Sequence, residues 1–137
     1  MKIFLDTNVL IYWVDAGPRA DMVERLLEGD VVISVQVLNE FANVLRKKRN
    51  MPLAAISELV DTLQHTCEVS DLTVRIHQAA LELAGRYKFS IYDAYILAAA
   101  AEMGCAAVYS EDMQHGMSVK VPKSMGGGAL SIKNPFL

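Results

Sequence analysis

The sequence contains only two cysteines, Cys67 and Cys105, in 137 residues. They stand far apart among apolar residues, and they have neither the spacing of metal ligands nor that of a disulfide framework. We therefore expect two reduced thiols in the core. The longest apolar run, residues 94–101, is far shorter than the roughly 20 residues of a membrane-spanning helix. A secretion signal is also missing, so we expect a cytoplasmic protein without membrane contact.

Positive charge is scarce as well. The chain has 13 Lys and Arg residues against 16 Asp and Glu residues, which gives a formal net charge of -3. A protein that binds nucleic acid through its overall charge is normally basic, so any such contact must use a local basic patch or bound cations. The one dense basic run is Arg46-Lys47-Lys48-Arg49. Either it complements the dipole at a helix C-terminus, or it forms a track for RNA phosphates.

The chain does contain a regular alternation of short apolar runs and amphipathic segments. Strands are expected at residues 2–6, 31–34, 67–69, 106–109 and 130–132, the last of these at a sheet edge. Helices are expected at residues 8–14, 19–28, 35–47, 53–64, 72–85 and 90–103, and a loop at residues 117–128. This alternation predicts an α/β protein with a central, mainly parallel sheet and helices on both faces. A length of 137 residues favours a single domain, residues 1–137.

Four acidic residues fall where predicted strands end or the following helices begin. Asp6 comes directly after the apolar residues 3–5, and Glu40 lies just inside the helix that follows residues 31–34. Asp93 opens a helix, and Asp112 follows the strand at residues 106–109. The C-terminal ends of parallel strands share one edge, which is where open α/β sheets bind ligands. We therefore expect these four acids, Asp6, Glu40, Asp93 and Asp112, to lie close together.

Three of the four acids also have an ordinary structural explanation. Asp6 is suited to cap a helix by accepting the amide hydrogen of Asn8 or Val9. Ser90 and Asp93 have the spacing of a capping box, and Asp112 fits a solvated turn. Taken together, however, the acids predict a cation site, because two carboxylates ~4 Å apart repel by about 4 kcal/mol at an effective dielectric constant of 20. Oxygen ligands favour Mg²⁺ or Mn²⁺.

The segments that carry these acids resemble those of the PIN-domain ribonucleases, most closely the VapC-type toxins of bacterial toxin–antitoxin pairs. The matching segments, in order, are residues 4–10 (FLDTNVL), 34–41 (SVQVLNEF), 91–100 (IYDAYILAAA), 109–116 (YSEDMQHG) and 134–136 (NPF). No single segment is specific, whereas the ordered set covers nearly the whole chain. One departure is the stretch of residues 117–128, which looks longer than usual in such proteins.

The resemblance implies a three-layer α/β/α fold and a Mg²⁺- or Mn²⁺-dependent endoribonuclease that cuts RNA with a metal-activated water. It also implies a homodimer and a cognate antitoxin. Carried over by position, Asp6, Glu40, Asp93 and Asp112 would be the catalytic and metal-binding acids. Supporting polar residues would be Thr7, Asn8 and Ser110.

Two other functions remain open at this point. A phosphotransferase or phosphatase with Asp6 as a covalent nucleophile is one, although such enzymes of the haloacid-dehalogenase type need a second aspartate two residues later, where this chain has Asn8. A non-catalytic acidic module that binds a partner is the other. A ribonuclease that uses a histidine pair finds no support, because the three histidines have no evident partner near the acids.

Overall fold

The computed structural model describes residues 1–137 and has one six-stranded sheet at its centre. The strands are β1 (Ile3–Leu5), β2 (Val31–Ser34), β3 (Glu68–Ser70), β4 (Ala107–Tyr109), β5 (Ser118–Lys120) and β6 (Ala129–Lys133). Their order in the sheet is β3-β2-β1-β4-β6-β5. All neighbouring strands are parallel except β5 and β6, so the predicted mainly parallel sheet is confirmed.

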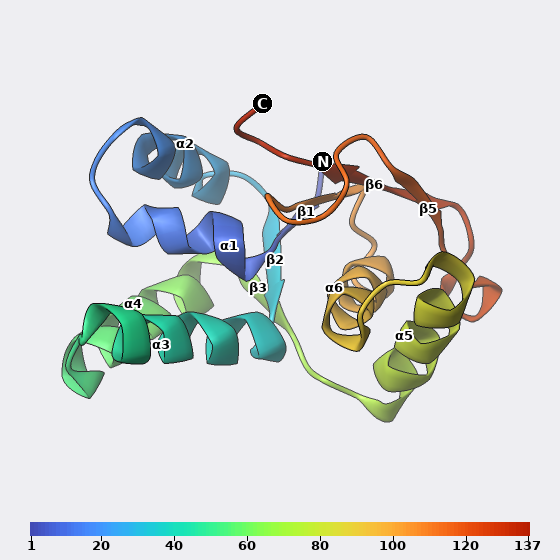
Figure 1. Ribbon diagram of the computed structural model, residues 1–137, viewed down its shortest axis with the longest axis horizontal. Helices are drawn as coiled ribbons and strands as arrows, with labels where there is room; N and C mark the ends of the chain where they lie inside the picture. Colours follow the sequence, from blue (N-terminus) through green and yellow to red (C-terminus); the bar gives the residue numbers. More distant parts are fainter.

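Helices cover both faces of this sheet. They are α1 (Thr7–Leu10), α2 (Pro18–Leu27), α3 (Val35–Arg49), α4 (Leu53–Thr66), α5 (Val74–Tyr87) and α6 (Ile91–Glu102), together with the 3-10 helices η1 (Ile11–Val14) and η2 (Lys123–Met125). Figure 1 shows α1 to α4 on one side of β1 and β2, and α5 and α6 on the other. The three-layer α/β/α arrangement is therefore confirmed.

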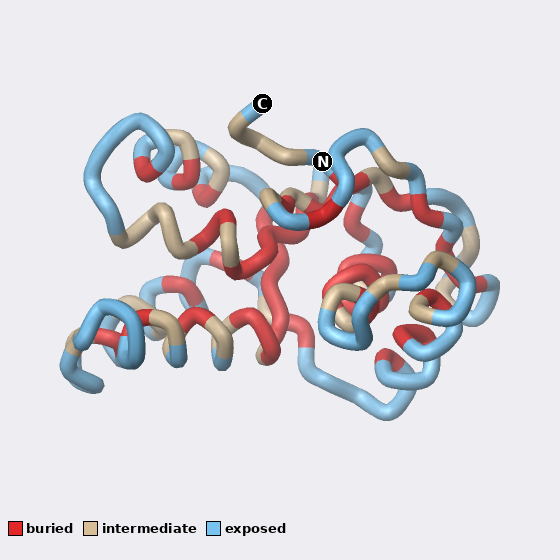
Figure 2. The backbone as a smooth tube through the Cα atoms, viewed as in Figure 1, coloured by how far each residue is buried: buried red, intermediate tan, exposed pale blue.

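The core lies where the central strands meet the helices. Figure 2 shows buried backbone running along these strands and through α6. Strands β1 and β2 are buried along their whole length, as expected for parallel strands covered on both faces. In α6, Ala98 to Ala101 are all buried, and their short side chains let the helix pack closely against β2 and β4.

The register of the strands determines which side chains meet at the C-terminal edge of the sheet. Leu5 of β1 pairs with Tyr109 of β4, so the next residues, Asp6 and Ser110, are neighbours. The Asp6 amide donates to the Tyr109 carbonyl over 3.0 Å, which extends the pairing past the end of β1. An acid and a hydroxyl far apart in the sequence are thereby placed side by side.

Two expectations about the C-terminal region are wrong. Residues 117–128 are not simply a loop, because they contain β5 and η2, and the strand at residues 129–133 is not at the edge, because β5 pairs with its outer side. β5 has only three residues, with Val119 buried between two exposed neighbours. Three residues are too few for the alternation of buried and exposed positions to predict a strand from the sequence. The nearby Gly126-Gly127-Gly128, all with positive φ, form a turn, which favoured the prediction of a loop.

Both cysteines are buried and free, as expected. Burial raises the pKa of the Cys67 thiol to about 11 and the pKa of the Cys105 thiol to about 12, so both stay protonated at neutral pH. None of the helices has the length and apolar character needed to cross a membrane.

Candidate active site

Asp6 is a buried carboxylate at the junction between β1 and α1, with 6% of its surface exposed. Its Oδ1 accepts the Thr7 amide hydrogen over 2.7 Å, and its Oδ2 accepts the Ser110 hydroxyl over 2.9 Å and the Asn8 side-chain amide over 3.2 Å. The expected cap of the first helix is therefore present, but the donor is Thr7 instead of Asn8 or Val9. The Val9 amide donates to the Asp6 carbonyl.

Burial gives Asp6 an unusual acidity. Its pKa rises from 3.8 to about 6, chiefly because burial disfavours the charged form. Hydrogen bonds from Ser110 and Thr7 oppose the rise, and the charges of Asp93 and Glu40 add to it. The carboxylates of three different segments therefore act on one another electrostatically, and a cation at this place would relieve the repulsion.

Glu40 lies on α3 and is held by two donors. Ser34 begins this helix by accepting the Val37 amide hydrogen over 3.3 Å. The Glu40 carboxylate accepts the Thr7 hydroxyl over 3.2 Å and the Gln36 side-chain amide over 2.8 Å. Thr7 thus contacts two of the four acids, one through its amide and one through its hydroxyl.

Asp93 and Asp112 lie on the other side of the site. Asp93 is half-buried in the first turn of α6, and its amide donates to the Ser90 hydroxyl over 3.1 Å, which supplies one half of the predicted capping box. The pKa of Asp93 is raised, mainly by burial and further by the charges of Asp112 and Glu40, while Ser90 lowers it. Asp112 is exposed and its amide donates to Ser110 over 3.3 Å.

Ser110 and Asn8 hold this edge of the sheet together. Ser110 is fully buried, and besides donating to Asp6 its hydroxyl accepts the Asp112 and Met113 amide hydrogens, each over 3.3 Å. The Asn8 side chain donates to Asp6 and to Ser110 and accepts the Glu111 amide hydrogen over 2.9 Å. These contacts fix the orientation of Asp6 and the course of the chain after β4.

The four acids nevertheless do not form a compact set of metal ligands. Nowhere in residues 1–137 do three or more histidine, cysteine, aspartate or glutamate side chains gather closely enough to hold a metal ion. Thr7 donates to both Asp6 and Glu40, but the other hydrogen-bond donors of these two acids are different. The expected close cluster is therefore replaced by a looser group whose members interact electrostatically.

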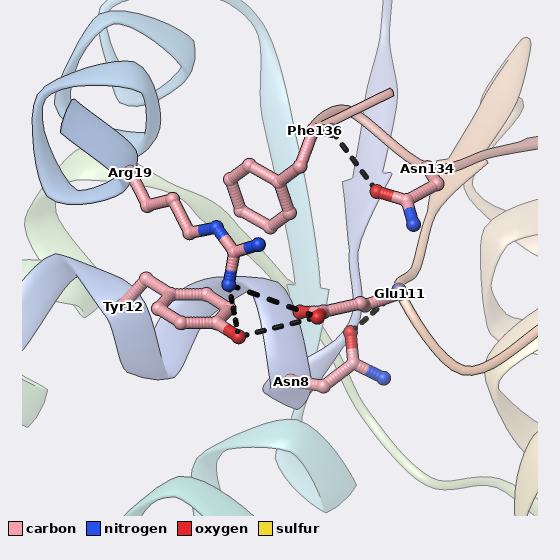
Figure 3. A network of polar contacts seen from close by, with 6 residues as sticks. All are labelled: Asn8, Tyr12, Arg19, Glu111, Asn134 and Phe136. Carbon is pink, nitrogen blue, oxygen red and sulfur yellow. Dashed lines mark hydrogen bonds and ion pairs between the residues drawn. The ribbon is translucent and has the colours of Figure 1, made fainter.

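A second network next to the site was not predicted from the sequence (Figure 3). The Glu111 carboxylate accepts the Tyr12 hydroxyl over 3.2 Å and lies 4.0 Å from the Arg19 guanidinium. Arg19 also donates to the Tyr12 hydroxyl over 2.9 Å, and its guanidinium lies 5.0 Å from the ring centre of Tyr12 and 5.2 Å from that of Phe136. Phe136, near the C-terminus, is thereby held against η1 and α2. Glu111 adjoins Asp112 in the sequence, but nothing in the sequence pairs it with Arg19.

The basic run Arg46-Lys47-Lys48-Arg49 is exposed at the C-terminal end of α3. Glu40 precedes it by six residues, a rise of about 9 Å along the helix axis. Arg49 is paired with Asp15. The run therefore lies at the opposite end of α3 from Ser34 and the sheet edge, and its contact with RNA stays a prediction.

Most of this chain matches a known protein family. The family described as PIN domain matches residues 3–116. The chain belongs to the PIN-domain family. The matched segment of this PIN domain includes all four acids and the supporting residues Thr7, Asn8 and Ser110, and it ends before β5 and β6.

Several solved structures share the fold of this PIN domain. The Mycobacterium tuberculosis toxin VapC20, described as cleaving the sarcin-ricin loop, is 26% identical with a TM-score of 0.65 over 80% of this chain and 89% of that chain. VapBC2 from Rickettsia felis, bound to a DNA fragment from its promoter, is 18% identical with a TM-score of 0.63 over 82% of this chain and 89% of that chain. FitAcB from Neisseria gonorrhoeae is 18% identical with a TM-score of 0.62 over 98% of both chains. A comparison with curated protein sequences gives no match.

Proposed function

We propose that this PIN domain is a metal-dependent endoribonuclease with Asp6, Glu40, Asp93 and Asp112 as its catalytic acids. The observation that carries the proposal is the buried Asp6 carboxylate, whose pKa is raised to about 6 beside the charges of Asp93 and Glu40 at the C-terminal edge of the sheet. Membership of the PIN-domain family and the likeness to a toxin described as cleaving the sarcin-ricin loop support the same activity.

The donor chemistry of the site fits a hard divalent cation. The four candidate ligands are carboxylates, and neither thiol lies among them, since Cys67 and Cys105 are buried elsewhere. Burial, and to a smaller extent the charges of the neighbouring acids, raises the pKa of Asp6 and of Asp93, and a bound cation would favour the charged form of both. Asp6 and Asp93 would hold Mg²⁺ or Mn²⁺ directly. Glu40 and Asp112 would contribute directly or through water. When bound, such an ion lowers the pKa of water and neutralises charge that develops on phosphate oxygens.

The remaining residues orient these acids. Thr7, Asn8 and Ser110 donate to Asp6 and so direct its two carboxylate oxygens, while Gln36 and Thr7 do the same for Glu40. A phosphotransferase of the haloacid-dehalogenase type would need a second aspartate two residues after Asp6, but this chain has Asn8 there, whose side-chain amide donates to Asp6 over 3.2 Å. The structure thus gives no specific support to the phosphotransferase alternative.

We further propose that the protein is the toxin of a toxin–antitoxin pair and works as a homodimer in the cytoplasm. The solved relatives support the first part, since they include toxin–antitoxin complexes such as one from Klebsiella pneumoniae (19% identical, TM-score 0.65, covering 80% of this chain and 86% of that chain). A neighbouring reading frame that encodes a small DNA-binding protein would be the candidate antitoxin. Expressing the chain alone should arrest growth, and co-expressing that neighbour should restore it.

The nuclease proposal is tested by incubating the wild-type protein with RNA in Mg²⁺, in Mn²⁺ and in EDTA. We expect cleavage only with the metal ions. The products should carry 5′-phosphate and 3′-hydroxyl ends, because a water and not the 2′-hydroxyl attacks the phosphorus. Full-rate cleavage in EDTA, or products with 2′,3′-cyclic phosphates, would refute the proposed chemistry.

A further inference from the structure

A groove of about 580 Å³ lies beside Glu40, between α3 and the first turns of α5 and α6. Its lining includes Gln36 and Asn39 of α3, Leu72 from the connection before α5, His77 of α5, and Tyr92 and Tyr95 of α6. The groove therefore adjoins the candidate active site, because Glu40 belongs to both and Asp93 follows Tyr92 directly.

The lining of the groove suits a flat, uncharged group better than a phosphate. Tyr92 is 71% exposed, and the apolar side chains of Leu72 and Val74 are 45% and 72% exposed. The rings of His77 and Tyr95 lie 5.7 Å apart, tilted by 34°, and are joined by a hydrogen bond between His77 Nδ1 and the Tyr95 hydroxyl. Lysine and arginine are missing from the lining, in which Glu40 is the one acidic group.

Gln36 connects the groove to the acids. Its side-chain amide donates to Glu40 over 2.8 Å and to the Tyr92 carbonyl over 3.2 Å. Gln36 is buried, and its two hydrogen bonds therefore hold the Glu40 carboxylate at a fixed distance from Tyr92, at the start of α6. A nucleotide whose phosphate reaches the acids would place its neighbouring base close to the Tyr92 ring.

We propose that this groove binds an unpaired base of RNA next to the phosphate that is cut, with Tyr92 as the stacking surface. The inference rests on the proposed ribonuclease function and extends it to the substrate, which must be single-stranded at this position. Proteins recognise single-stranded RNA by stacking bases on aromatic side chains and by hydrogen bonds to base edges. Asn39 and Thr73 supply polar groups beside the rings for the second purpose. The groove is continuous with the acids through Glu40, and its lining has no lysine or arginine, which favours a base over a phosphate as the bound group. The polar side chains of Asn39 and Thr73 favour a base over an apolar segment of a partner protein.

The test is the binding of a labelled single-stranded RNA oligonucleotide in EDTA, measured by fluorescence anisotropy across a salt series. Tyr92→Ala should weaken binding by roughly 5- to 150-fold, the range that stacking of one base supplies. Tyr92→Phe keeps the ring and should keep the affinity. The salt dependence should stay the same in both variants, because it reports phosphate contacts. The Tyr92 carbonyl bond to Gln36 uses the main chain, so these variants retain it.

A matched pair of leucine variants adds a control. Leu72→Ala should weaken binding, whereas Leu81→Ala, at a similarly exposed leucine (48%) outside the groove, should leave it unchanged. Unchanged affinity in Tyr92→Ala would overturn the proposal. So would a Tyr92→Ala protein that keeps its RNA affinity but loses self-association in light scattering, since the groove would then be a protein interface.

The failure of this inference can be told apart from the failure of the nuclease proposal. If the wild-type protein cleaves RNA and Tyr92→Ala binds it normally, the groove is not a base site although the enzyme is a ribonuclease. If wild-type protein binds the oligonucleotide through Tyr92 but does not cleave it in Mg²⁺ or Mn²⁺, the base site stands and the nuclease proposal is wrong.

Discussion

Replacing Asp6 by asparagine should change the stability of the protein in a way that reverses with pH. Well below pH 3.8 the wild-type carboxyl is protonated in both the folded and the unfolded state, so it contributes no difference to stability. Because its pKa rises from 3.8 to about 6 on folding, the folded state binds the proton more tightly, and stability falls as pH increases through this interval. Above the folded pKa the full penalty applies, and a rise of this size corresponds to about 3 kcal/mol.

In the Asp6→Asn variant the side chain at position 6 is neutral, so folding no longer carries the cost of burying an ionised carboxylate there. The variant loses part of the hydrogen bonding from Ser110 and Asn8, because its amide nitrogen is a donor that faces donors, which costs about 1 kcal/mol. In EDTA we therefore expect the variant to be more stable than the wild type by about 2 kcal/mol at pH 7.5 and less stable by about 1 kcal/mol at about pH 3.

The assay is urea unfolding in EDTA at several pH values, followed by the fluorescence of the single tryptophan, Trp13. This residue is half-buried and packs near Phe41, so its emission should report unfolding. Asp71→Asn, at an exposed aspartate without an ion pair, is the control for loss of one carboxylate. A difference between wild type and Asp6→Asn that stays constant from pH 4 to pH 8 would refute the reasoning.

Three other predictions concern the metal, the hydroxyl beside Asp6 and the basic run. Mg²⁺ at 100 times its dissociation constant should stabilise the wild type by about 2.7 kcal/mol in urea unfolding, and this gain should be absent in Asp6→Asn. Ser110→Ala should cost about 1–3 kcal/mol in the same assay, because it leaves buried groups without their partner. Replacing Lys47 and Lys48 by alanine should flatten the salt dependence of RNA binding, by roughly 0.7 in slope for each phosphate that the protein no longer neutralises, as measured by anisotropy in EDTA.

Each of these three predictions has a matched control. A stabilisation by Mg²⁺ that is equal in both proteins would place the ion elsewhere. Ser70→Ala removes a buried hydroxyl that donates only to the Asp71 carbonyl, and it should cost less than Ser110→Ala. A double replacement of Lys120 and Lys123 by alanine changes the net charge by the same amount as the Lys47 and Lys48 variant. Equal salt slopes in these two double variants would contradict a specific role for the basic run.

The parts of the fold that were predictable are those in which one segment determines its own structure. The apolar runs of β1, β2 and β4 are buried on both faces, and such strands produce a continuous apolar sequence. The predicted Ser90 cap acts within three residues of its partner, the Asp93 amide. The placement of Asp6 beside Ser110 depends on the pairing of β1 with β4, which the alternation of strands and helices does not specify, so Ser110 was expected at the site only from the family resemblance.

The parts that were not predictable depend on contacts between distant segments or on short elements. Arg19, Tyr12, Glu111 and Phe136 come from three separate regions, and no local pattern brings them together. The looser spacing of the acids has a similar cause, since Thr7 and Gln36 fix the Glu40 carboxylate through bonds that the helical pattern of α3 does not reveal.

The central claim is that Asp6 belongs to the machinery that cuts RNA, and the rate of RNA cleavage in Mg²⁺ tests it most directly. The comparison is between wild type, Asp6→Asn and the exposed control Asp71→Asn, each checked for folding by urea unfolding at the same pH. We expect Asp6→Asn to lose at least about 100-fold in rate, since groups that only support metal ligands already contribute 10- to 100-fold, while Asp71→Asn cleaves like the wild type. A folded Asp6→Asn protein that cleaves RNA at the wild-type rate would contradict the account.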